Sequence, residues 1–428
     1  MSDMEQKKNE KSYEFIKETI KEKPIDKKKI MKHILRILAS GGLFGLAASA
    51  VLLLAAPEIR KNIEGKQEES QIQFPSDTEN SEENTKNNIP EEQSSEAGSQ
   101  PAAEEELTPE KYQKLFADVF ATAQEAKKSM VRVRGSKNDE EWFQTPYESE
   151  ISGLLVAESG QELFVLTEYR IVENVDRIQV VFYDGTVTDA RFLKGDTNTG
   201  FAILKVPKAG ISAETKEVIT IAPLGESYAV EQGKPVLAIG SPMGYSDSVG
   251  YGIITSTCNT ISKTDAEYSL LTTDIAGSSL GSGVLLNLEG EVIGLIAQSF
   301  AREDTQNLVT GLGVSEVKEM IQILSDETKD IVYLGITGKS ITKDISEKKG
   351  IPIGVFVEQV EVDSPAMQVG IQNGDVIIEL NGEKIETVKG YQHQLKFCKA
   401  GQTIKVKAMR QGTEGYVEVD FDVTLQAR

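Results

Sequence analysis

The sequence predicts a mostly β protein that follows a single membrane-spanning helix and a disordered acidic linker. Three observations predict this order: an uncharged apolar run at residues 37–56, a polar acidic stretch behind it, and many short strand-like stretches from about residue 130 onward. The chain has 428 residues, of which 39% are hydrophobic. That length fits roughly two to four domains with compact cores of their own.

Residues 37–56, ILASGGLFGLAASAVLLLAA, carry no charge. As a helix they span about 30 Å, the thickness of the apolar core of a bilayer. Five basic residues lie just before the run: Lys27, Lys28, Lys29, Lys32 and Arg36. The positive-inside rule then makes residues 1–36 a charged cytoplasmic segment and places everything after residue 57 outside the cell membrane, in a single-pass topology. The alternative is a cleaved signal peptide, for which the run is long and begins late.

Residues 57–106 are predicted to be a disordered acidic linker. From residue 65 onward they are rich in Glu, Ser, Gln and Asn and have almost no aromatic residues. Such a segment cannot bury enough apolar surface to offset the entropy lost on ordering. We expect it to hold the folded part of the chain off the membrane.

Charge and cysteine content exclude several function classes. The formal net charge of -21 argues against nucleic acid as a partner, which normally needs a basic face. Cys258 and Cys398 are far apart and have neither the spacing of a disulfide framework nor that of zinc ligands. We therefore expect two free thiols, and the sequence predicts no metal and no cofactor.

An ordered region of short strands is predicted over residues 107–325. It opens with Thr108-Pro109-Glu110-Lys111, a helix-start signature with a cap and an early proline, and the helical spacing runs to about Ala126. Short strands punctuated by turns follow: SMVRVRG, ISGLLVA, ELFVLT, RIQVVFYDGTVTDARFL, GFAILKV, PVLAIGS, GIITSTC, SLLTTD, GVLLNLEGEVIGLIA and TGLGVSEV. Many short strands with few helices predict an all-β barrel or sandwich.

A second, α+β pattern is predicted over residues 330–428, after an amphipathic helix at 314–324. Its core is DSPAMQVGIQNGDVIIELNGEKIETV, residues 363–388. Here SPA begins a helix, Gly370 ends it, GD turns into a strand, and NG makes the next turn. A further helix is expected near GYQHQLKF.

From about residue 110 onward the chain resembles the HtrA-type (Do-like) serine proteases. The segments 165–206, 233–244 and 288–295 resemble strands of the family's peptidase domain, and 363–388 resembles the core of a PDZ domain. The resemblance implies a trypsin-like double β-barrel over 107–325 followed by a PDZ domain over 330–428.

The resemblance also implies a peptide-binding site. Tyr333-Leu334-Gly335-Ile336 matches the family's carboxylate-binding loop, whose backbone N–H groups hold a peptide's C-terminal carboxylate while the peptide adds as a strand. His393, in GYQHQLKF, either lines the peptide groove or occupies a simple surface position.

The family's catalytic triad is degraded in this chain. Alignment of LTEYRIV puts Arg170 where the histidine should be, and alignment of DTNTGFAILKV puts Gly200 at the aspartate. A serine hydroxyl needs a neighbouring base, and a guanidinium stays protonated. The only histidines of the chain are His33, in the predicted cytoplasmic segment, and His393.

The nucleophile position depends on the direction of alignment. Counting backwards from VLLN gives Gly281, and counting forwards from Thr273-Asp274 gives Ser282, the residual nucleophile candidate. A base for Ser282 would have to come from Glu168, Tyr169 or Lys194, and the spacing singles out none of them.

The predicted function is therefore that of a membrane-anchored HtrA-like pseudoprotease. It would bind peptide C-termini or unfolded segments in extracytoplasmic protein quality control. The family commonly forms trimers, so the resemblance implies a homotrimer or co-assembly with an active relative that the chain modulates. Two alternatives stay open: an active serine endopeptidase that uses Ser282 with a non-histidine base, and a PDZ scaffold for one specific partner.

Overall fold

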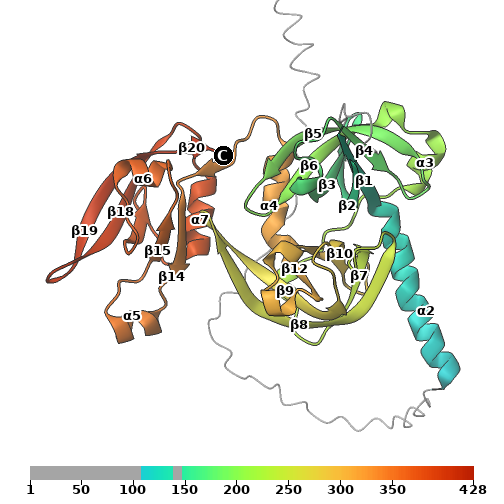
Figure 1. Ribbon diagram of the computed structural model, residues 1–428. Coiled ribbons are helices and arrows are strands. Elements are labelled where there is room, and N and C mark those ends of the chain that lie inside the picture. The colour runs from blue at the N-terminus through green and yellow to red at the C-terminus, as the bar shows by residue number, and fades with distance from the viewer. Residues whose placement is uncertain (1–107, 138–146) are drawn as a thin grey trace, which may run out of the picture. The chain divides into compact units, whose positions relative to one another are not determined.

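The computed structural model describes residues 108–137 and 147–428, which belong to one compact unit, Ser70–Arg428 (Figure 1). The predicted cytoplasmic segment (1–36), membrane helix (37–56) and linker (57–106) lie outside the described residues. Within the two described ranges, no helix is both long and apolar enough to cross a membrane.

Helix α2 (Pro109–Ala126) opens the described part of the chain, as the sequence predicts. The Thr108 side chain accepts a hydrogen bond from the backbone N–H of Lys111 at 3.3 Å. Because Pro109 lacks an N–H, its place in the first turn leaves no helical hydrogen bond unmade. The predicted helix start is confirmed.

Two closed β-barrels follow, shown in green and yellow in Figure 1. The first has the strand order β1-β2-β3-β6-β5-β4, and the second the order β10-β11-β12-β9-β8-β7. The elements of the first are β1 (Met130–Lys137), β2 (Tyr147–Ser159), β3 (Glu162–Glu168), β4 (Arg177–Val181), β5 (Val187–Asp196), β6 (Phe201–Pro207) and α3 (Ala213–Val218). Those of the second are β7 (Pro235–Ser241), β8 (Ser248–Lys263), β9 (Ala266–Ala276), β10 (Ser282–Leu286), β11 (Val292–Ile296) and β12 (Leu308–Gly313). Every stretch predicted as strand contains one, so the mostly β double barrel is confirmed.

Strand β7 shows why a strand of these barrels can be a continuous run of apolar residues in the sequence. Successive side chains of a strand point to opposite faces. Val236 and Ala238 pack inside the second barrel, whereas Leu237 and Ile239 join the cluster between the two barrels. Since both faces are buried, PVLAIGS shows no polar alternation.

Helix α4 (Val314–Ser325) closes the barrel region and confirms the predicted helix at 314–324. Val314, Val317, Ile321 and Leu324 are all fully buried and belong to the cluster between the barrels. Their three- and four-residue spacing puts them on one helix face.

The PDZ region is an α+β unit with its own core. Its main sheet has the order β14-β15-β16-β18-β19, with β17 paired to β16, and β13 pairs with β20. The elements are β13 (Val332–Tyr333), β14 (Ile336–Ser340), α5 (Lys343–Lys349), β15 (Val355–Val360), α6 (Pro365–Val369), β16 (Val376–Leu380), β17 (Glu383–Lys384), α7 (Val388–Lys396), β18 (Thr403–Gly412), β19 (Gly415–Thr424) and β20 (Gln426–Ala427). Ser364 caps α6, Gly370 ends it in a left-handed conformation, and α7 covers GYQHQLK, all as predicted.

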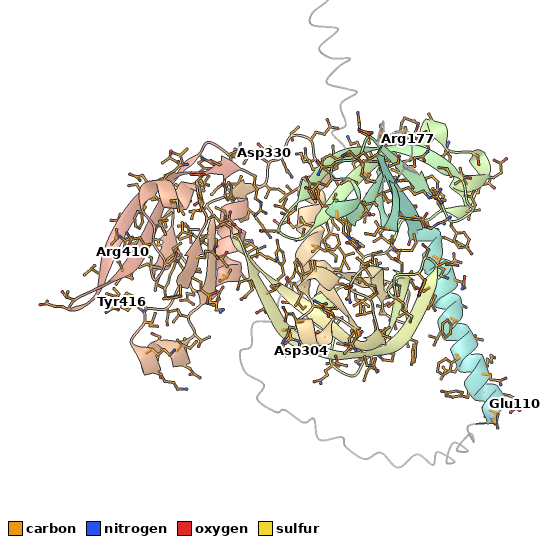
Figure 2. The ribbon with its side chains drawn as sticks, in the orientation of Figure 1. Glu110, Arg177, Asp304, Asp330, Arg410 and Tyr416 are labelled. Carbon is orange, nitrogen blue, oxygen red and sulfur yellow. The ribbon has the colours of Figure 1, made fainter. Side chains whose placement is uncertain are left out.

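A partly buried ion pair links the PDZ sheet to the end of α6. The guanidinium of Arg410 (labelled in Figure 2) donates two 2.7 Å hydrogen bonds to the Asp375 carboxylate, which is 1% exposed. A third bond, of 2.8 Å, reaches the carbonyl oxygen of Gly370. Two parallel hydrogen bonds of this kind are the common bidentate geometry between a guanidinium and a carboxylate.

Candidate functional site

The three positions assigned to the triad line one cavity of about 390 Å³. Arg170 comes from a short 3₁₀ turn after β3, Gly200 from the turn before β6, and Gly281 from the loop before β10. The cavity is thus made by both barrels. The structure brings together the residues that the alignment named.

Arg170 bridges the two barrels with its charged end. Its Nε donates to Glu168 Oε2 at 2.6 Å, and its Nη2 donates to the carbonyl oxygen of Leu280 at 3.2 Å. Leu280 directly precedes Gly281. A guanidinium, which donates hydrogen bonds and accepts none, therefore occupies the position that the alignment assigns to the histidine.

Gly281 leaves no room for a side chain. It is buried, and its N–H donates to the carbonyl oxygen of Ser278 at 2.7 Å. A Cβ atom at this position would lie 2.3 Å from the carbonyl oxygen of Pro242 and 2.9 Å from that of Ser278. A serine fits here only if the loop changes shape.

Ser282 is a buried structural hydroxyl at the start of β10, only 1% exposed. Its Oγ accepts a hydrogen bond from the N–H of Ser152 at 3.1 Å and shares one of 2.7 Å with the hydroxyl of Ser241. Both of these partners are serines, one from β2 and one from β7. The hydroxyl thus links the two barrels and has no titratable base among its partners in the described chain.

The other proposed bases lie in two different places. Lys194 donates to the carbonyl oxygens of Asp326 (2.6 Å) and Lys329, in the segment between α4 and β13, and does not line the cavity. Tyr169 and Glu168 do line it. Burial raises the pKa of Glu168, against the opposing effect of the Arg170 guanidinium. Glu168 Oε1 has no hydrogen-bond partner among the described residues.

The loop Tyr333-Leu334-Gly335-Ile336, predicted to bind a carboxylate, joins β13 to β14. Gly335 has φ +97°, and a Cβ there would lie 2.2 Å from the Cβ of Ser364, so this position requires glycine. The N–H groups of Leu334, Gly335 and Ile336 converge on one point. That point is occupied by the side-chain carboxylate of Asp265.

Asp265 belongs to the turn between β8 and β9 of the second barrel. Its Oδ2 accepts from Leu334 and Gly335 at 2.7 and 2.8 Å, and its Oδ1 accepts from Ile336 at 3.1 Å. The Tyr391 hydroxyl, fully buried on α7, donates to Oδ1 at 2.5 Å. Burial raises the pKa of Asp265, while these four hydrogen bonds oppose that effect.

Sequence reasoning did not find Asp265. The local stretch KTDAEY reads as a hairpin turn, and an aspartate is ordinary there. Nothing in its spacing shows that this hairpin reaches a loop some 70 residues later.

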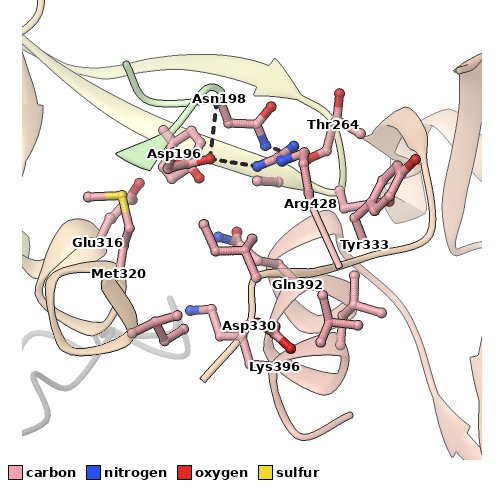
Figure 3. A pocket seen from close by; sticks show the side chains of 17 residues that line it. Asp196, Asn198, Thr264, Glu316, Met320, Asp330, Tyr333, Gln392, Lys396 and Arg428 are labelled. Atoms are coloured by element: carbon pink, nitrogen blue, oxygen red, sulfur yellow. Dashed lines mark hydrogen bonds and ion pairs between the residues drawn. The ribbon is translucent and has the colours of Figure 1, made fainter. Parts of the chain in front are cut away.

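His393 lies on the exposed surface of α7, its ring 4.9 Å from that of Phe397. The hydrogen bonds donated by the N–H groups of residues 334–336 go to Asp265 and not to His393. The neighbouring Gln392 instead lines the cavity drawn in Figure 3.

That cavity, of about 90 Å³, lies beside Asp265 and is lined from the barrels, from α4 and from the PDZ region (Figure 3). At its edge Arg428 Nη2 pairs with Asp196 Oδ1 at 2.6 Å, and Asp196 is 3% exposed. Burial and the nearby Asp196 charge raise the pKa of Tyr268, which lines the same cavity. Among the described residues, no group of three or more His, Cys, Asp and Glu is arranged to hold a metal ion.

Comparison with known proteins agrees with this architecture. The model of the trypsin-like peptidase domain matches residues 151–295, and that of the PDZ domain matches residues 332–421.

Two curated relatives illustrate the similarity. A "Probable periplasmic serine endoprotease DegP-like" of Pseudomonas putida (strain W619) is 32% identical over 281 residues, which cover 64% of this chain and 55% of the relative. A "Serine protease Do-like HtrA" of Lactobacillus helveticus is 27% identical over 294 residues, covering 65% of this chain and 68% of the relative. The chain thus spans about half the length of the Pseudomonas protein.

Solved structures show the same fold. The structure titled "HtrA-type protease AlgW with decapeptide" has a TM-score of 0.53 and 21% identity, and the match covers 72% of this chain and 98% of that one. A second structure of that protease, with a tripeptide, has a TM-score of 0.54 and 22% identity over 72% of this chain and 97% of that one.

Proposed function

Since this chain belongs to the HtrA-type proteases, with a trypsin-like peptidase domain followed by a PDZ domain, we propose that it acts by binding and has lost peptide-bond cleavage. It is a pseudoprotease that binds peptide C-termini or unfolded segments in extracytoplasmic protein quality control. The relatives are named as proteases, and the support for a loss of cleavage comes from residues of this chain.

One observation supports the proposed loss of cleavage: no histidine occurs between His33 and His393. The alignment, in agreement with this, puts Arg170 where the family has its histidine. Without an acceptor beside the nucleophile, a serine hydroxyl is a poor nucleophile at neutral pH. Two further contacts agree with this. Gly281 has no space for a serine side chain, and the Ser282 hydroxyl is buried against Ser152 and Ser241.

The proposed peptide binding is supported by the geometry of residues 334–336 in the PDZ domain. Three consecutive N–H groups, those of Leu334, Gly335 and Ile336, are aimed at a single carboxylate. Backbone donors of this kind capture the C-terminus of a peptide that adds to a sheet edge. Two similar solved structures are titled as complexes with a decapeptide and a tripeptide.

Location and assembly are part of the proposal. The Pseudomonas relative is named periplasmic, and the uncharged run at 37–56 suits a single membrane anchor with residues 1–36 in the cytoplasm. A homotrimer, or co-assembly with an active relative, would place several PDZ domains on one assembly and strengthen binding through effective concentration.

The test is incubation of the full-length protein with unfolded casein. Complex formation is followed by size-exclusion chromatography and casein integrity by gel electrophoresis. We expect casein to be bound and intact. Casein fragments that disappear in Ser282→Ala would establish the active endopeptidase instead. Retention of a single C-terminal sequence from a peptide library, without casein binding, would establish a scaffold for one partner.

A further inference from the structure

We propose that Asp265 is an internal ligand of the PDZ domain. Its carboxylate takes the place of a peptide's C-terminal carboxylate, and a peptide has to displace it in order to bind. This inference rests on the proposed peptide-binding function, and it adds how that site is regulated.

The side chain of Asp265 satisfies the carboxylate-binding loop fully. It accepts from three consecutive backbone N–H groups at 2.7, 2.8 and 3.1 Å and from the Tyr391 hydroxyl at 2.5 Å. Asp265 is 6% exposed, so water does not compete for these donors to any large extent. An incoming carboxylate finds no free donor in the loop while Asp265 is there.

The backbone of Asp265 also imitates a bound peptide. Its N–H donates to the carbonyl oxygen of Ile336 at 2.7 Å. Ile336 begins β14, and a peptide that extends this sheet would use the same acceptor. The preceding residue, Thr264, donates from its hydroxyl to the carboxylate of Glu361. Asp265 thus occupies both the carboxylate position and the first position of an added strand.

Helix α7, which supplies Tyr391, is held by the same barrel. Lys389 on α7 pairs with Glu316 of α4 at 3.2 Å, and Lys396 pairs with Glu319 of α4 at 2.5 Å. The side-chain oxygen of Gln392 accepts from the N–H of Glu267 in β9 at 3.5 Å. Gln392, Lys396 and Glu316 are visible around the cavity of Figure 3. Displacement of Asp265 therefore loosens a set of contacts between the barrel and the PDZ domain.

Two consequences follow. A competing ligand needs a carboxylate at the loop, as Asp265 itself supplies, because an amide nitrogen would place its N–H groups against the N–H groups of the loop. Peptide binding and release of the β8–β9 hairpin from the PDZ loop are thermodynamically linked. Release of the hairpin raises the affinity for the peptide by the same factor by which a bound peptide favours release.

The first measurement is hydrogen exchange of the peptide segment that contains residues 334–336, in the full-length protein without ligand. We compare wild type with Asp265→Gly and Asp265→Asn. Glycine and asparagine both tolerate the left-handed backbone of Asp265, at φ 56°, so the turn is kept. Asp247→Gly is the matched control, since Asp247 is also a turn aspartate, with φ 61° and a highly exposed side chain paired to Lys127.

We expect residues 334–336 to exchange faster in both Asp265 variants and to be unchanged in the Asp247 variant. Equal exchange in all the proteins would overturn the inference, whatever peptides the protein binds. Circular dichroism of the variants shows whether the fold is retained. If one of the two Asp265 variants has an altered secondary structure, the exchange rates are compared with those of the other Asp265 variant alone.

The second measurement is the affinity of a fluorescein-labelled peptide, NTISKTD, which copies residues 259–265 and ends in a free carboxylate. We expect tighter binding to Asp265→Gly than to wild type, by on the order of tenfold, and loss of binding when the peptide ends in an amidated asparagine, so that its last residue carries no carboxylate. Equal affinity for both proteins would overturn displacement while leaving the proposed peptide binding intact. Faster exchange with no binding of the peptide to either protein would contradict the proposed function, and the occupancy by Asp265 would stand.

Discussion

The hydroxyl of Ser282 lies 2.7 Å from the hydroxyl of Ser241, with both side chains nearly inaccessible to solvent. Ser282 belongs to β10 and Ser241 to β7, and the two residues are directly paired in the sheet. The residual nucleophile candidate thus serves as a hydrogen-bond partner for polar groups of neighbouring strands.

This geometry predicts a purely structural effect for Ser282→Ala. The substitution removes the acceptor of the buried Ser152 N–H and one of the two hydroxyl partners of Ser241, which keeps the Ser152 hydroxyl at 3.2 Å. We expect a loss of about 1–3 kcal/mol in the free energy of unfolding, measured by urea denaturation, and unchanged casein binding. Ser279→Ala, in the exposed part of the same loop, should stay within about 0.5 kcal/mol of wild type. Equal stability of the two variants would contradict the structural role.

Gly281→Ser, which puts a serine at the nucleophile position given by the backward alignment, should not produce cleavage. Its Cβ would lie 2.3 Å from the carbonyl oxygen of Pro242, so the loop has to move or strain. We expect destabilisation of about 1–3 kcal/mol and no hydrolysis of casein, read from thermal unfolding and gel electrophoresis. A variant as stable as wild type would show that the loop adapts freely.

Glu168 gives a pH-dependent prediction. Burial raises its pKa in the folded protein. A carboxyl group with a raised folded-state pKa contributes stability that is present below its ordinary value of about 4.3 and is lost as the pH rises through the folded-state pKa. The thermal midpoint of wild type relative to Glu168→Gln should therefore fall as the pH rises from about 4 toward neutrality. A thermal midpoint of wild type that instead rises relative to Glu168→Gln with increasing pH would show that the effect of Arg170 on the pKa of Glu168 outweighs the effect of burial.

Tyr391→Phe tests the internal ligand from the PDZ side. It removes the donor to Asp265 Oδ1 but keeps the ring that fills the PDZ core. A hydrogen bond to a charged group contributes about 1.5–3 kcal/mol, so Asp265 should be held less firmly. The labelled peptide should bind more tightly than to wild type, yet less tightly than to Asp265→Gly. The control is Tyr416→Phe, at the second position of β19, which should leave the affinity unchanged. A weaker affinity in Tyr391→Phe would indicate that this hydroxyl contacts the peptide instead of Asp265.

Local patterns predicted most of the fold because their physical causes are local. The cap at Thr108 and the spacing of α4 depend on neighbours three or four residues away. Strand β7 was predictable because a strand that is buried on both faces has to be apolar throughout.

The candidate site was only partly predictable from the sequence, because contacts between distant parts of the chain decide its geometry. The alignment named Arg170, Gly200 and Gly281, which do line one cavity. It could not show that Ser282 is buried, because its hydroxyl is enclosed by strands 41 and 130 residues away in sequence. Asp265 was missed for the same reason, since its partners belong to the other domain.

The central claim, that this HtrA-type chain binds but does not cleave, is tested most directly by a fluorophosphonate probe. The full-length wild-type protein, Ser282→Ala and Ser279→Ala are treated with the probe, and labelled peptides are located by mass spectrometry beside a casein cleavage assay. We predict no labelled serine and intact casein in all three. Labelling at Ser282, with casein cleavage that disappears in Ser282→Ala alone, would contradict the account and show a serine protease that works without histidine.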